Sequence, residues 1–284
     1  MLTSPMWFLK ELELYKHVKP YRLDFDPEDD NFPRTNVDRV EIPGVPIHDI
    51  RGNEDQLLFP KCGFSILHMP SSLTTLDYDD HDLVTDRYYS FIEKAVQDFS
   101  EKSHLGAKVV ALDHKVRKRH STFPISNGEN YSDPQPVMVA HVDWTPQTIE
   151  KKLRLTVGDE KTKVILGGQY QFCHAWRPLF GPLRGYPLAV CDYSTVNPEN
   201  DYEITDDVYE NHGVDENYMV YHRPGHKWYY LSDQEPTEIL LFREYDSTVG
   251  LMSGIPHCAI PNPVPSEHIM ARQSIEVELV IYWP

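Results

Sequence analysis

The sequence is poor in cysteine and in positive charge. Its four cysteines form no Cys-x-x-Cys pair, which argues against a thiolate zinc site; they are Cys62, Cys173, Cys191 and Cys258. A chain of 284 residues can bury a core without disulfides, so we expect reduced thiols in a cytoplasmic protein. Lysine and arginine number 27 against 44 aspartates and glutamates, a formal net charge of -17. This deficit argues against a nucleic-acid partner.

A long apolar run and a glycine-rich phosphate loop are also missing. The first twenty residues carry charge throughout, so we expect neither a signal peptide nor a membrane span. The segments LGGQYQ and GPLRG match neither the dinucleotide-binding pattern nor the Walker pattern. A methyltransferase normally needs a nucleotide loop of this kind, so the sequence disfavours that class of enzyme.

What the sequence does contain favours strands and loops. Aromatic residues make up 12% of the chain and prolines number 23, which is typical of a compact, strand-rich fold. The basic cluster HKVRKRH, at 114–120, alternates within an expected strand. We interpret it as a solvated strand face.

We expect the chain to form a single domain, 1–284, with three segments. Residues 1–75 are rich in proline and acidic residues and predict an extended N-terminal arm with short strands. Residues 76–104 contain an amphipathic helix with apolar residues spaced by three and four. Residues 105–284 hold many β-branched and aromatic runs between turn residues, which predict an antiparallel double-sheet roll with helical support. The apolar helix residues are Tyr88, Phe91, Ile92, Ala95, Val96 and Phe99.

The segment PVMVAHVDWTP, residues 136–146, places a histidine and an aspartate at the end of a strand. Alternate side chains of a strand share one face, so His141 and Asp143 are expected to point the same way as the valines at 137 and 139. Thr145 is suited to cap a helix that begins at Pro146. About one His-x-Asp is expected by chance here, so the pair alone does not define a site.

The alternative to coincidence is a metal site. Two histidines and one carboxylate on one face of an iron(II) ion leave three positions open, and His141 with Asp143 would supply two of these ligands. His257 starts a later strand and is the candidate for the third. A 2-oxoglutarate cosubstrate would also need a cation for its far carboxylate. Arg272 opens the final strand, with Ser274 on the same face.

Other histidines could supply the third ligand. His226 is followed by Arg243, which ends a strand instead of opening one. His174 is followed by Arg184 through a turn that contains proline and glycine. Neither arginine has a serine two residues later, so the sequence favours His257.

The same alternation leaves a difficulty in the final strand. It puts Glu276 and Glu278 on the inward face beside Ser274. Burying unpaired carboxylates is costly, so either a β-bulge or an opening of that face to solvent is needed.

Taken together, these segments resemble a known family. The chain is similar, in matching order over residues 105–284, to the fungal oxygenases grouped with gibberellin-desaturase-like and aspergillic-acid-type hydroxylases. The resemblance is carried by HVDWTP, AWRPLFGPLRGYPLAVCDYSTV, HKWYYLSDQEPTEILLFREYDS, PHCAI and RQSIEVELVIYW. It implies a mainly β (α+β) fold whose core is a double-stranded β-helix, the cupin-like jelly roll. It also implies iron(II), 2-oxoglutarate and oxygen, usually in secondary metabolism.

The resemblance assigns roles by position. It implies that His141, Asp143 and His257 bind iron and that Arg272 and Ser274 bind 2-oxoglutarate. Ile260 stands where the family often has phenylalanine, which would alter the packing of the pocket and leave the ligands unchanged.

Trp176 and Arg177 belong to the family's Trp-Arg-Pro motif, which we place near the pocket as tentative substrate contacts. The structural alternative is a core tryptophan and an arginine paired with an acid. An arginine beside an aromatic wall suits a carboxylate on an apolar body. We therefore expect a small substrate with a polar or anionic group, such as an amino acid or an amino-acid-derived metabolite.

The function predicted from these features is C–H oxidation of a small metabolite, by hydroxylation, desaturation or oxidative ring closure. A non-redox cupin-like metal-binding protein, lyase or isomerase is the alternative, but it would have no use for Arg272 and Ser274. A plain interaction protein is a further alternative.

Overall fold

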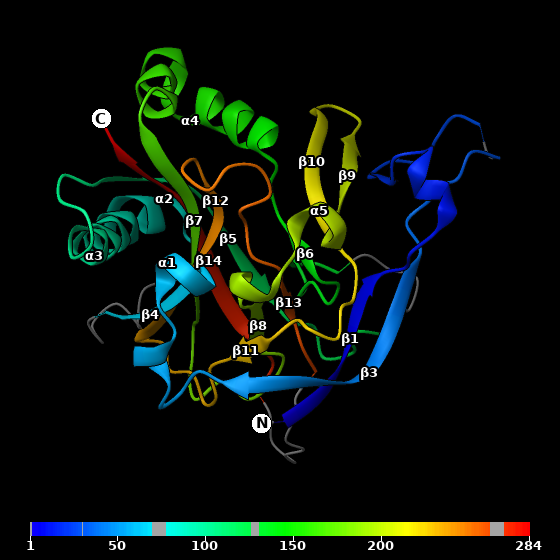
Figure 1. Cartoon of the computed structure of the whole chain (residues 1–284), viewed down its shortest axis with the longest axis horizontal. Coiled ribbons are helices and arrows are strands. Elements are labelled where there is room, and N and C mark those ends of the chain that lie inside the picture. Colours follow the sequence, from blue (N-terminus) through cyan, green and yellow to red (C-terminus); the bar gives the residue numbers. More distant parts are fainter. Residues whose placement is uncertain (1, 30, 70–77, 126–130, 262–269) are drawn as a thin grey trace.

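Two β-sheets that face one another form the body of the protein (Figure 1). The computed structural model describes residues 2–29, 31–69, 78–125, 131–261 and 270–284. Within these ranges the strands form a nine-stranded large sheet and a five-stranded small sheet. One apolar cluster joins Trp176 and Phe242 of the small sheet to Leu188 and Val190 of the large sheet, so the sheets enclose a common core.

Neighbouring strands of both sheets are mostly antiparallel; only β3–β11 and β2–β9, among the described strands, pair in parallel. The large sheet runs from edge to edge as β1 (Leu2–Leu9), β3 (Arg39–Asp49), β11 (Trp228–Tyr230), β8 (Leu188–Cys191), β13 (His257–Ala259), β6 (His141–Val142), β10 (Gly213–Val220), β9 (Tyr202–Tyr209) and β2 (Tyr21–Leu23). The small sheet runs as β4 (Phe64–His68), β12 (Glu238–Asp246), β7 (Gln169–Pro178), β14 (Gln273–Trp283) and β5 (Lys108–Lys118).

Two longer helices support the sheets. Helix α3 (Tyr89–Glu101) covers the small sheet, and α4 (Pro146–Leu166) follows directly after β6 (Figure 1). As the sequence predicts, the Thr145 side chain caps α4 and Pro146 is its first residue. The short helices are α1 (Phe59–Cys62), α2 (His81–Leu83) and α5 (Pro198–Asp201).

The amphipathic pattern of α3 places one face of the helix against the sheet. Tyr88, Ile92 and Val96 lie four residues apart and are buried among small-sheet residues such as Ala175. Phe91 was expected on this face, but its side chain is 45% exposed because the buried stripe follows the spacing of four. The predicted supporting helix is confirmed, with a narrower apolar face.

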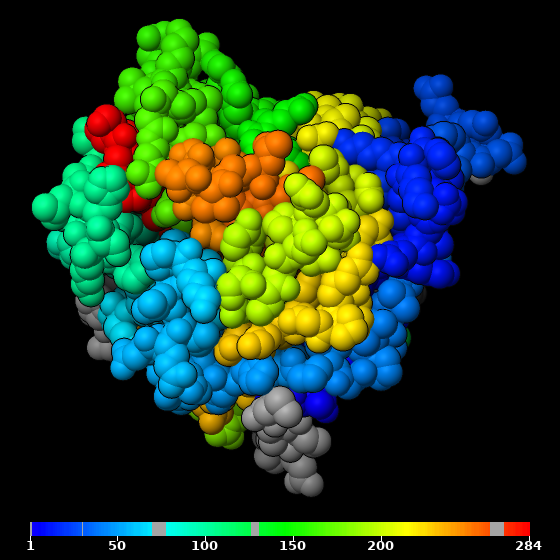
Figure 2. All heavy atoms as spheres, viewed as in Figure 1, coloured from blue at the N-terminus to red at the C-terminus, as the bar shows by residue number. Residues whose placement is uncertain are grey.

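The N-terminal segment, 1–75, contributes strands to both sheets. Strands β1 and β3 pair with each other at one edge of the large sheet, and β2 pairs with β9 at the opposite edge. Strand β4 pairs with β12 in the small sheet. Figure 2 shows the dark blue N-terminal residues lying directly against the yellow region that contains β10. The arm is therefore built into the sheets and reaches the region around β9 and β10.

The basic cluster at 114–120 is only partly a solvated strand face. The side chain of Arg117 is 15% exposed and forms an ion pair with Glu276 at 3.0 Å. Val116, on the other face of β5, packs against the core between α3 and the small sheet. The interpretation as a solvated face is wrong for Arg117, because the adjacent strand β14 supplies an acidic partner.

The prediction of a mainly β double-sheet fold with supporting helices is confirmed. All four cysteines are buried free thiols. Among the described helices, none combines the length and the apolar character needed to span a bilayer.

Candidate metal centre

His141 and Asp143 lie at the end of β6, where the chain turns into α4. Val137, Val139, His141 and Asp143 all line one cavity, as the sequence predicts, although Met138 lines it too and the strand itself is only His141–Val142. His141 Nε2 is 3.2 Å from an oxygen of Asp143. The capped start of α4 immediately after this segment fixes the point at which the strand ends.

His257 meets this pair from the adjacent strand. Strand β13 pairs with β6 so that His257 lies directly opposite His141, and the two imidazole centroids are 4.4 Å apart. His257 Nε2 is 3.4 Å from Asp143 Oδ2. One ligand atom from each of the three residues lies within 4.8 Å of the others. The structure thus brings together the three residues that the sequence singled out.

The outer nitrogen of each imidazole contacts a backbone carbonyl. His141 Nδ1 lies 2.7 Å from the Val139 carbonyl oxygen, and His257 Nδ1 lies 3.3 Å from that of Ile255. A carbonyl oxygen can only accept a hydrogen bond, so these contacts place the N–H on Nδ1 and leave Nε2 as the lone-pair nitrogen directed at Asp143. Both histidines are therefore oriented as metal ligands usually are.

The charge state of the site also suits a cation. Burial would raise the pKa of Asp143, but its contacts with His141 and His257 outweigh burial and hold the pKa well below the usual value. Burial would lower the pKa of His141, yet Asp143 and the Val139 carbonyl raise it overall. Asp143 is therefore an ionised ligand at neutral pH.

A second group of potential ligands shares Asp143. Asp143, His174 and Glu244 also offer ligand atoms within 4.8 Å of one another. Neither ring nitrogen of His174 has a hydrogen-bond partner among the described residues, and burial lowers the pKa of its imidazole to about 4. The group with His257 is the better site for iron(II), because it has two imidazoles and one carboxylate and both imidazoles are oriented.

Arg272 and Ser274 lie together in the core. Both are at most 2% exposed, and Arg272 Nε donates to Ser274 Oγ at 3.2 Å. Arg272 Nη1 donates to the carbonyl of Tyr186 at 2.7 Å, and the guanidinium lies 5.0 Å from the ring centroid of Trp176. A guanidinium held in this way has a fixed orientation, which suits recognition of a carboxylate.

Trp176 and Arg177 point to opposite faces of the small sheet. Trp176 faces the core beside Arg272, and its indole N–H finds no hydrogen-bond partner among the described residues. The guanidinium of Arg177 lies on the α3 side, where it donates to the hydroxyls of Tyr78 and Tyr88 and to the carbonyl of Pro236. The structure therefore does not bring Arg177 to the metal centre.

Of the two rival histidine–arginine pairs, only His174 lies at the metal centre, with Nδ1 3.3 Å from Asp143 Oδ2. The other histidine and both arginines lie elsewhere. His226 is buried and bonds Asp201 at 2.9 Å. Arg184 is on the surface and pairs with Asp233 at 2.7 Å. Arg243 is buried and donates to the Ser253 carbonyl at 2.8 Å. Neither His226 nor either arginine lines the cavity described next.

The two glutamates that posed a difficulty have cationic partners. Glu276 pairs with Arg117 at 3.0 Å, and Glu278 pairs with Lys152 of α4 at 2.9 Å. Both glutamates also line the cavity. The inward face of β14 is thus partly open and partly neutralised.

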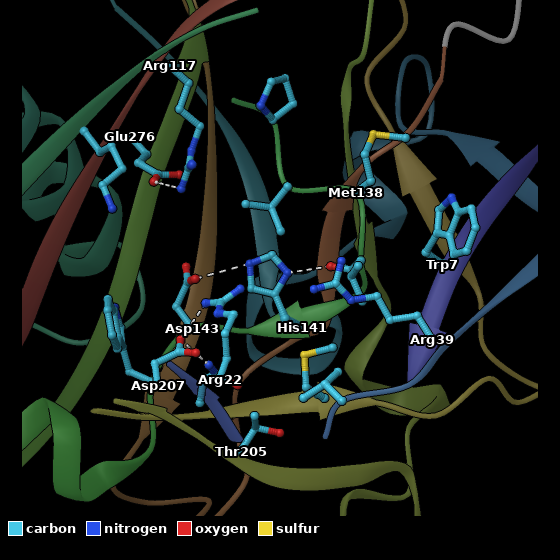
Figure 3. A pocket seen from close by; sticks show the side chains of 18 of the residues that line it. Trp7, Arg22, Arg39, Arg117, Met138, His141, Asp143, Thr205, Asp207 and Glu276 are labelled. Carbon is cyan, nitrogen blue, oxygen red and sulfur yellow. Dashed lines mark hydrogen bonds and ion pairs between the residues drawn. The ribbon is translucent and has the colours of Figure 1, made fainter. Parts of the chain in front are cut away.

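A cavity of about 690 Å³ lies in front of His141 and Asp143 (Figure 3). The small sheet lines the cavity with residues of β5, β7 and β14. The large sheet lines it with residues of β6, β9 and β10, and the N-terminal arm contributes Trp7, Arg22, Val37 and Arg39. Figure 3 shows Arg22 and Arg39 directed from the arm toward the space beside His141. Sequence reasoning missed these arm residues, because arginines in an irregular segment carry no local signal for a site.

Glu244 is a second residue that sequence reasoning missed. It occupies a β-bulge of β12, where the register with β7 shifts between Arg243 and Tyr245. Its buried carboxylate accepts a hydrogen bond from the backbone N–H of Asp143 at 2.9 Å. Burial, followed by the charge of Asp143, raises the pKa of Glu244 well above its ordinary value.

The chain is similar to several fungal enzymes. It is 31% identical to "Oxidoreductase AN1597" of Emericella nidulans over 73% of this chain and 72% of that protein. It is 29% identical to "Hydroxylase/desaturase efuI" of Hormonema carpetanum over 84% of this chain and 83% of that protein. It is 26% identical to "Fe(II)/2-oxoglutarate-dependent dioxygenase nvfI" of Aspergillus novofumigatus over 84% of this chain and 82% of that protein.

A solved structure shows the same fold. The iron and alpha-ketoglutarate-dependent endoperoxidase NvfI superimposes with a TM-score of 0.80 over 99% of this chain and 97% of that chain, at 23% identity. The predicted cupin-like jelly-roll fold is thereby confirmed. Residues 6–282 match the family described as "Oxidoreductase/YMDC permease-like domain". The chain therefore belongs to this oxidoreductase family, with fungal Fe(II)/2-oxoglutarate-dependent oxygenases among its relatives.

Proposed function

We propose that the protein is an Fe(II)/2-oxoglutarate-dependent oxygenase that oxidises a C–H bond of a small metabolite, with His141, Asp143 and His257 as its iron ligands. The observation that carries the assignment is the convergence of these three side chains from β6, the turn after it and β13, with one ligand atom of each within 4.8 Å. Similarity to fungal enzymes of this class supports the iron and the cosubstrate.

The residues present fit an iron(II) ion. The donor set is two imidazoles and one carboxylate, the set used by non-haem iron oxygenases. Asp143 is ionised, and its carboxylate lies close to Nε2 of His141 and Nε2 of His257. A cation placed among these atoms would complete their interactions.

We propose that Arg272 and Ser274 bind the far carboxylate of 2-oxoglutarate. Iron with 2-oxoglutarate and oxygen supplies the oxidising power, which no side chain of the protein possesses. The protein's own residues bind and orient. Arg272, held by the Tyr186 carbonyl and beside the Trp176 ring, presents a fixed cation in a dry environment, where charge-assisted hydrogen bonds are strong.

The whole chain acts as one oxygenase unit in this proposal. Residues from the N-terminal arm and from the body line the same cavity, so the arm forms part of the wall around the substrate. The substrate is a small molecule that fits this cavity. The expectation of an amino acid or amino-acid-derived substrate depended on Arg177, which lies on the other face of the sheet. Our proposal keeps the anionic group and does not include Arg177.

The experiment is an anaerobic titration of the purified protein with Fe(II) and 2-oxoglutarate. We expect the weak visible charge-transfer band of the iron chelate, followed by succinate formation on exposure to oxygen. His257→Ala should lose the band. His226→Ala is the matched control, since it removes another buried histidine whose partner is Asp201.

Absence of the band and of succinate in the wild-type protein would reject the oxygenase proposal in favour of a non-redox metal-binding protein. Loss of the band in His226→Ala, with retention in His257→Ala, would reject the assignment of the third ligand.

A further inference from the structure

The charged residues of the cavity wall are not all paired. Arg22 forms an ion pair with Asp207 at 2.8 Å, and Arg117 forms one with Glu276 at 3.0 Å. Arg39 also lines the cavity, but it has no acidic side chain within 4.0 Å among the described residues. One arginine of the arm therefore faces the cavity without an anionic partner.

Arg22 and Arg39 are close enough to affect each other. Burial, followed by the positive charge of Arg22, lowers the pKa of Arg39. Arg39 is exposed, and so is the Arg22 side chain, which keeps 55% of its surface open to solvent. Two neighbouring like charges repel each other even where water screens them, and an anion between or beside them would relieve that repulsion.

Unpaired polar atoms lie on the neighbouring strands. Thr205 is 2% exposed, and its hydroxyl has no hydrogen-bond partner among the described residues. The side-chain oxygen of Asn217, a half-buried residue, also has none there. The two residues lie directly opposite each other on β9 and β10, and both line the cavity. Asp207, the partner of Arg22, is two residues from Thr205 on the same face of β9. Buried hydroxyls without partners are costly and indicate a missing ligand.

The strand register places these groups away from the metal centre along β10. Met219 lies directly opposite His141, and Asn217 is two residues farther along the strand. Two residues of a strand span about 7 Å, and each further strand adds about 4.8 Å across the sheet. Arg22, on β2, lies three strands from β6 in the sheet and is therefore separated from His141 by about the length of a small metabolite, whereas Arg39 lies on β3, beside β1.

Much of the cavity wall is apolar and includes Trp7, Val37, Val139, Trp144 and Met219. Glu276 and Glu278 also line the cavity, and each is paired with a cation. The wall chemistry thus suits an apolar body that carries one anionic group at one end.

We propose that the substrate is an apolar monocarboxylic acid whose carboxylate binds at Arg39, Arg22 and the Thr205 hydroxyl, with the apolar body extending toward His141. This inference rests on the proposed oxygenase function for the identity of the metal end.

The test uses two dyes that share one apolar body. Anilinonaphthalene sulfonate carries a single negative charge, and N-phenylnaphthylamine is its neutral parent. Both are titrated into the wild-type protein, Arg39→Gln and Arg34→Gln, and fluorescence gives the dissociation constants. Arg34 is the matched control, because it is an arginine of the arm that pairs with Asp26 and does not line the cavity.

We expect Arg39→Gln to weaken binding of the anionic dye about tenfold or more and to leave the neutral dye unchanged. Arg34→Gln should change neither. Comparison between dyes removes the part of the signal that comes from apolar contact alone. A monocarboxylate such as decanoate should displace the anionic dye from the wild-type protein and displace it less well from Arg39→Gln.

Three results would overturn the inference. They are equal effects of Arg39→Gln on both dyes, no measurable binding of either dye to the wild-type protein, and a loss of 2-oxoglutarate affinity in Arg39→Gln, which would assign Arg39 to the cosubstrate. The wild-type iron and 2-oxoglutarate titration is run in parallel. Suppose that the charge-transfer band is absent while Arg39→Gln still weakens binding of only the anionic dye. In that case the oxygenase proposal fails and the anion site stands.

Discussion

The carboxylate of Glu244 lies 3.6 Å from Nδ1 of His257, on the side of the imidazole away from Asp143. Its second oxygen accepts the backbone N–H of Asp143 at 2.9 Å. One buried side chain thus contacts two of the three proposed iron ligands. The His257 Nδ1 proton is directed at the Ile255 carbonyl, so Glu244 contacts His257 without a hydrogen bond and acts on Asp143 through its backbone N–H. Groups behind metal ligands in this way commonly affect metal affinity.

We therefore expect Glu244→Gln to weaken Fe(II) binding by about tenfold to a hundredfold while the fold is retained. The raised pKa of Glu244 describes the protein without a metal, and a bound cation would favour the ionised carboxylate. Glutamine keeps the shape and the acceptor for the Asp143 N–H but cannot ionise beside His257. Anaerobic Fe(II) titration gives the dissociation constant. Glu238→Gln is the matched control, since Glu238 is a buried glutamate of the same strand that pairs with Arg51. An unchanged affinity in Glu244→Gln would mean that the contact is structural only.

The second prediction separates the two groups of potential ligands around Asp143. His257→Ala should abolish Fe(II) binding, because it removes one of two oriented imidazoles. His174→Ala should retain Fe(II) binding, because no hydrogen bond orients its ring. The measurement is the same anaerobic titration, with circular dichroism to show that both variants are folded. Iron binding lost in His174→Ala and kept in His257→Ala would assign the metal to the group that includes Glu244.

Local features of the metal centre could be predicted from the sequence because they depend on neighbouring residues. Strand alternation places His141 and Asp143 on one face, and Thr145 and Pro146 fix the start of the helix after them. Glu244 could not be predicted, since its direction depends on a β-bulge and on the packing of β12 beside β6 residues that are far away in sequence.

The arm arginines and Arg177 show a second limit of prediction from the sequence. The sequence placed Arg177 near the pocket through its neighbour Trp176, but adjacent residues of a strand point to opposite faces. Arg22 and Arg39 both reach the cavity although β2 is one edge strand of the large sheet and β3 lies beside the opposite edge strand, β1. That arrangement is a property of the tertiary fold.

The third prediction concerns 2-oxoglutarate. Arg272→Ala should raise the apparent Michaelis constant for 2-oxoglutarate, because a charge-assisted contact of this kind contributes roughly 1.5–3 kcal/mol, about tenfold to a hundredfold in affinity. Arg272→Lys should be intermediate, since it keeps the charge and loses the planar geometry. Arg184→Gln, at the surface, is the control. An unchanged dependence on 2-oxoglutarate in Arg272→Ala would refute the assignment.

The fourth prediction is that Arg177 contributes to stability. Arg177→Gln should lower the free energy of unfolding by about 1.5–3 kcal/mol, because the guanidinium donates to Tyr88 and Pro236 in a fully buried position. Burial lowers the pKa of this guanidinium to about 9, which fits a desolvated side chain. Urea unfolding measures the change, and 2-oxoglutarate binding should be unaffected. Loss of substrate-coupled turnover with unchanged stability would restore Arg177 as a substrate residue.

The fifth prediction is a pH dependence of stability that arises from Glu278. Burial raises the pKa of its carboxyl from 4.5 to about 7, although Lys152 at 2.9 Å opposes the shift. Between these two values the folded protein binds more protons than the unfolded chain, so this group makes stability fall as pH rises from 4.5 to 7. The upper limit of the loss is about 3 kcal/mol, since one pKa unit corresponds to about 1.4 kcal/mol.

Glu278→Gln should remove this contribution, because glutamine does not titrate. Unfolding free energies are measured in urea with a chelator present. As pH rises, the wild-type protein should lose stability relative to Glu278→Gln, and the difference should level off above pH 7. A chelator is needed because a bound cation would favour the ionised carboxylate and shrink the window. Glu160→Gln is the control, since Glu160 is an exposed glutamate of α4 paired with Lys163. A difference that stays constant across the window would show that Lys152 keeps Glu278 ionised throughout, and that the ion pair outweighs burial.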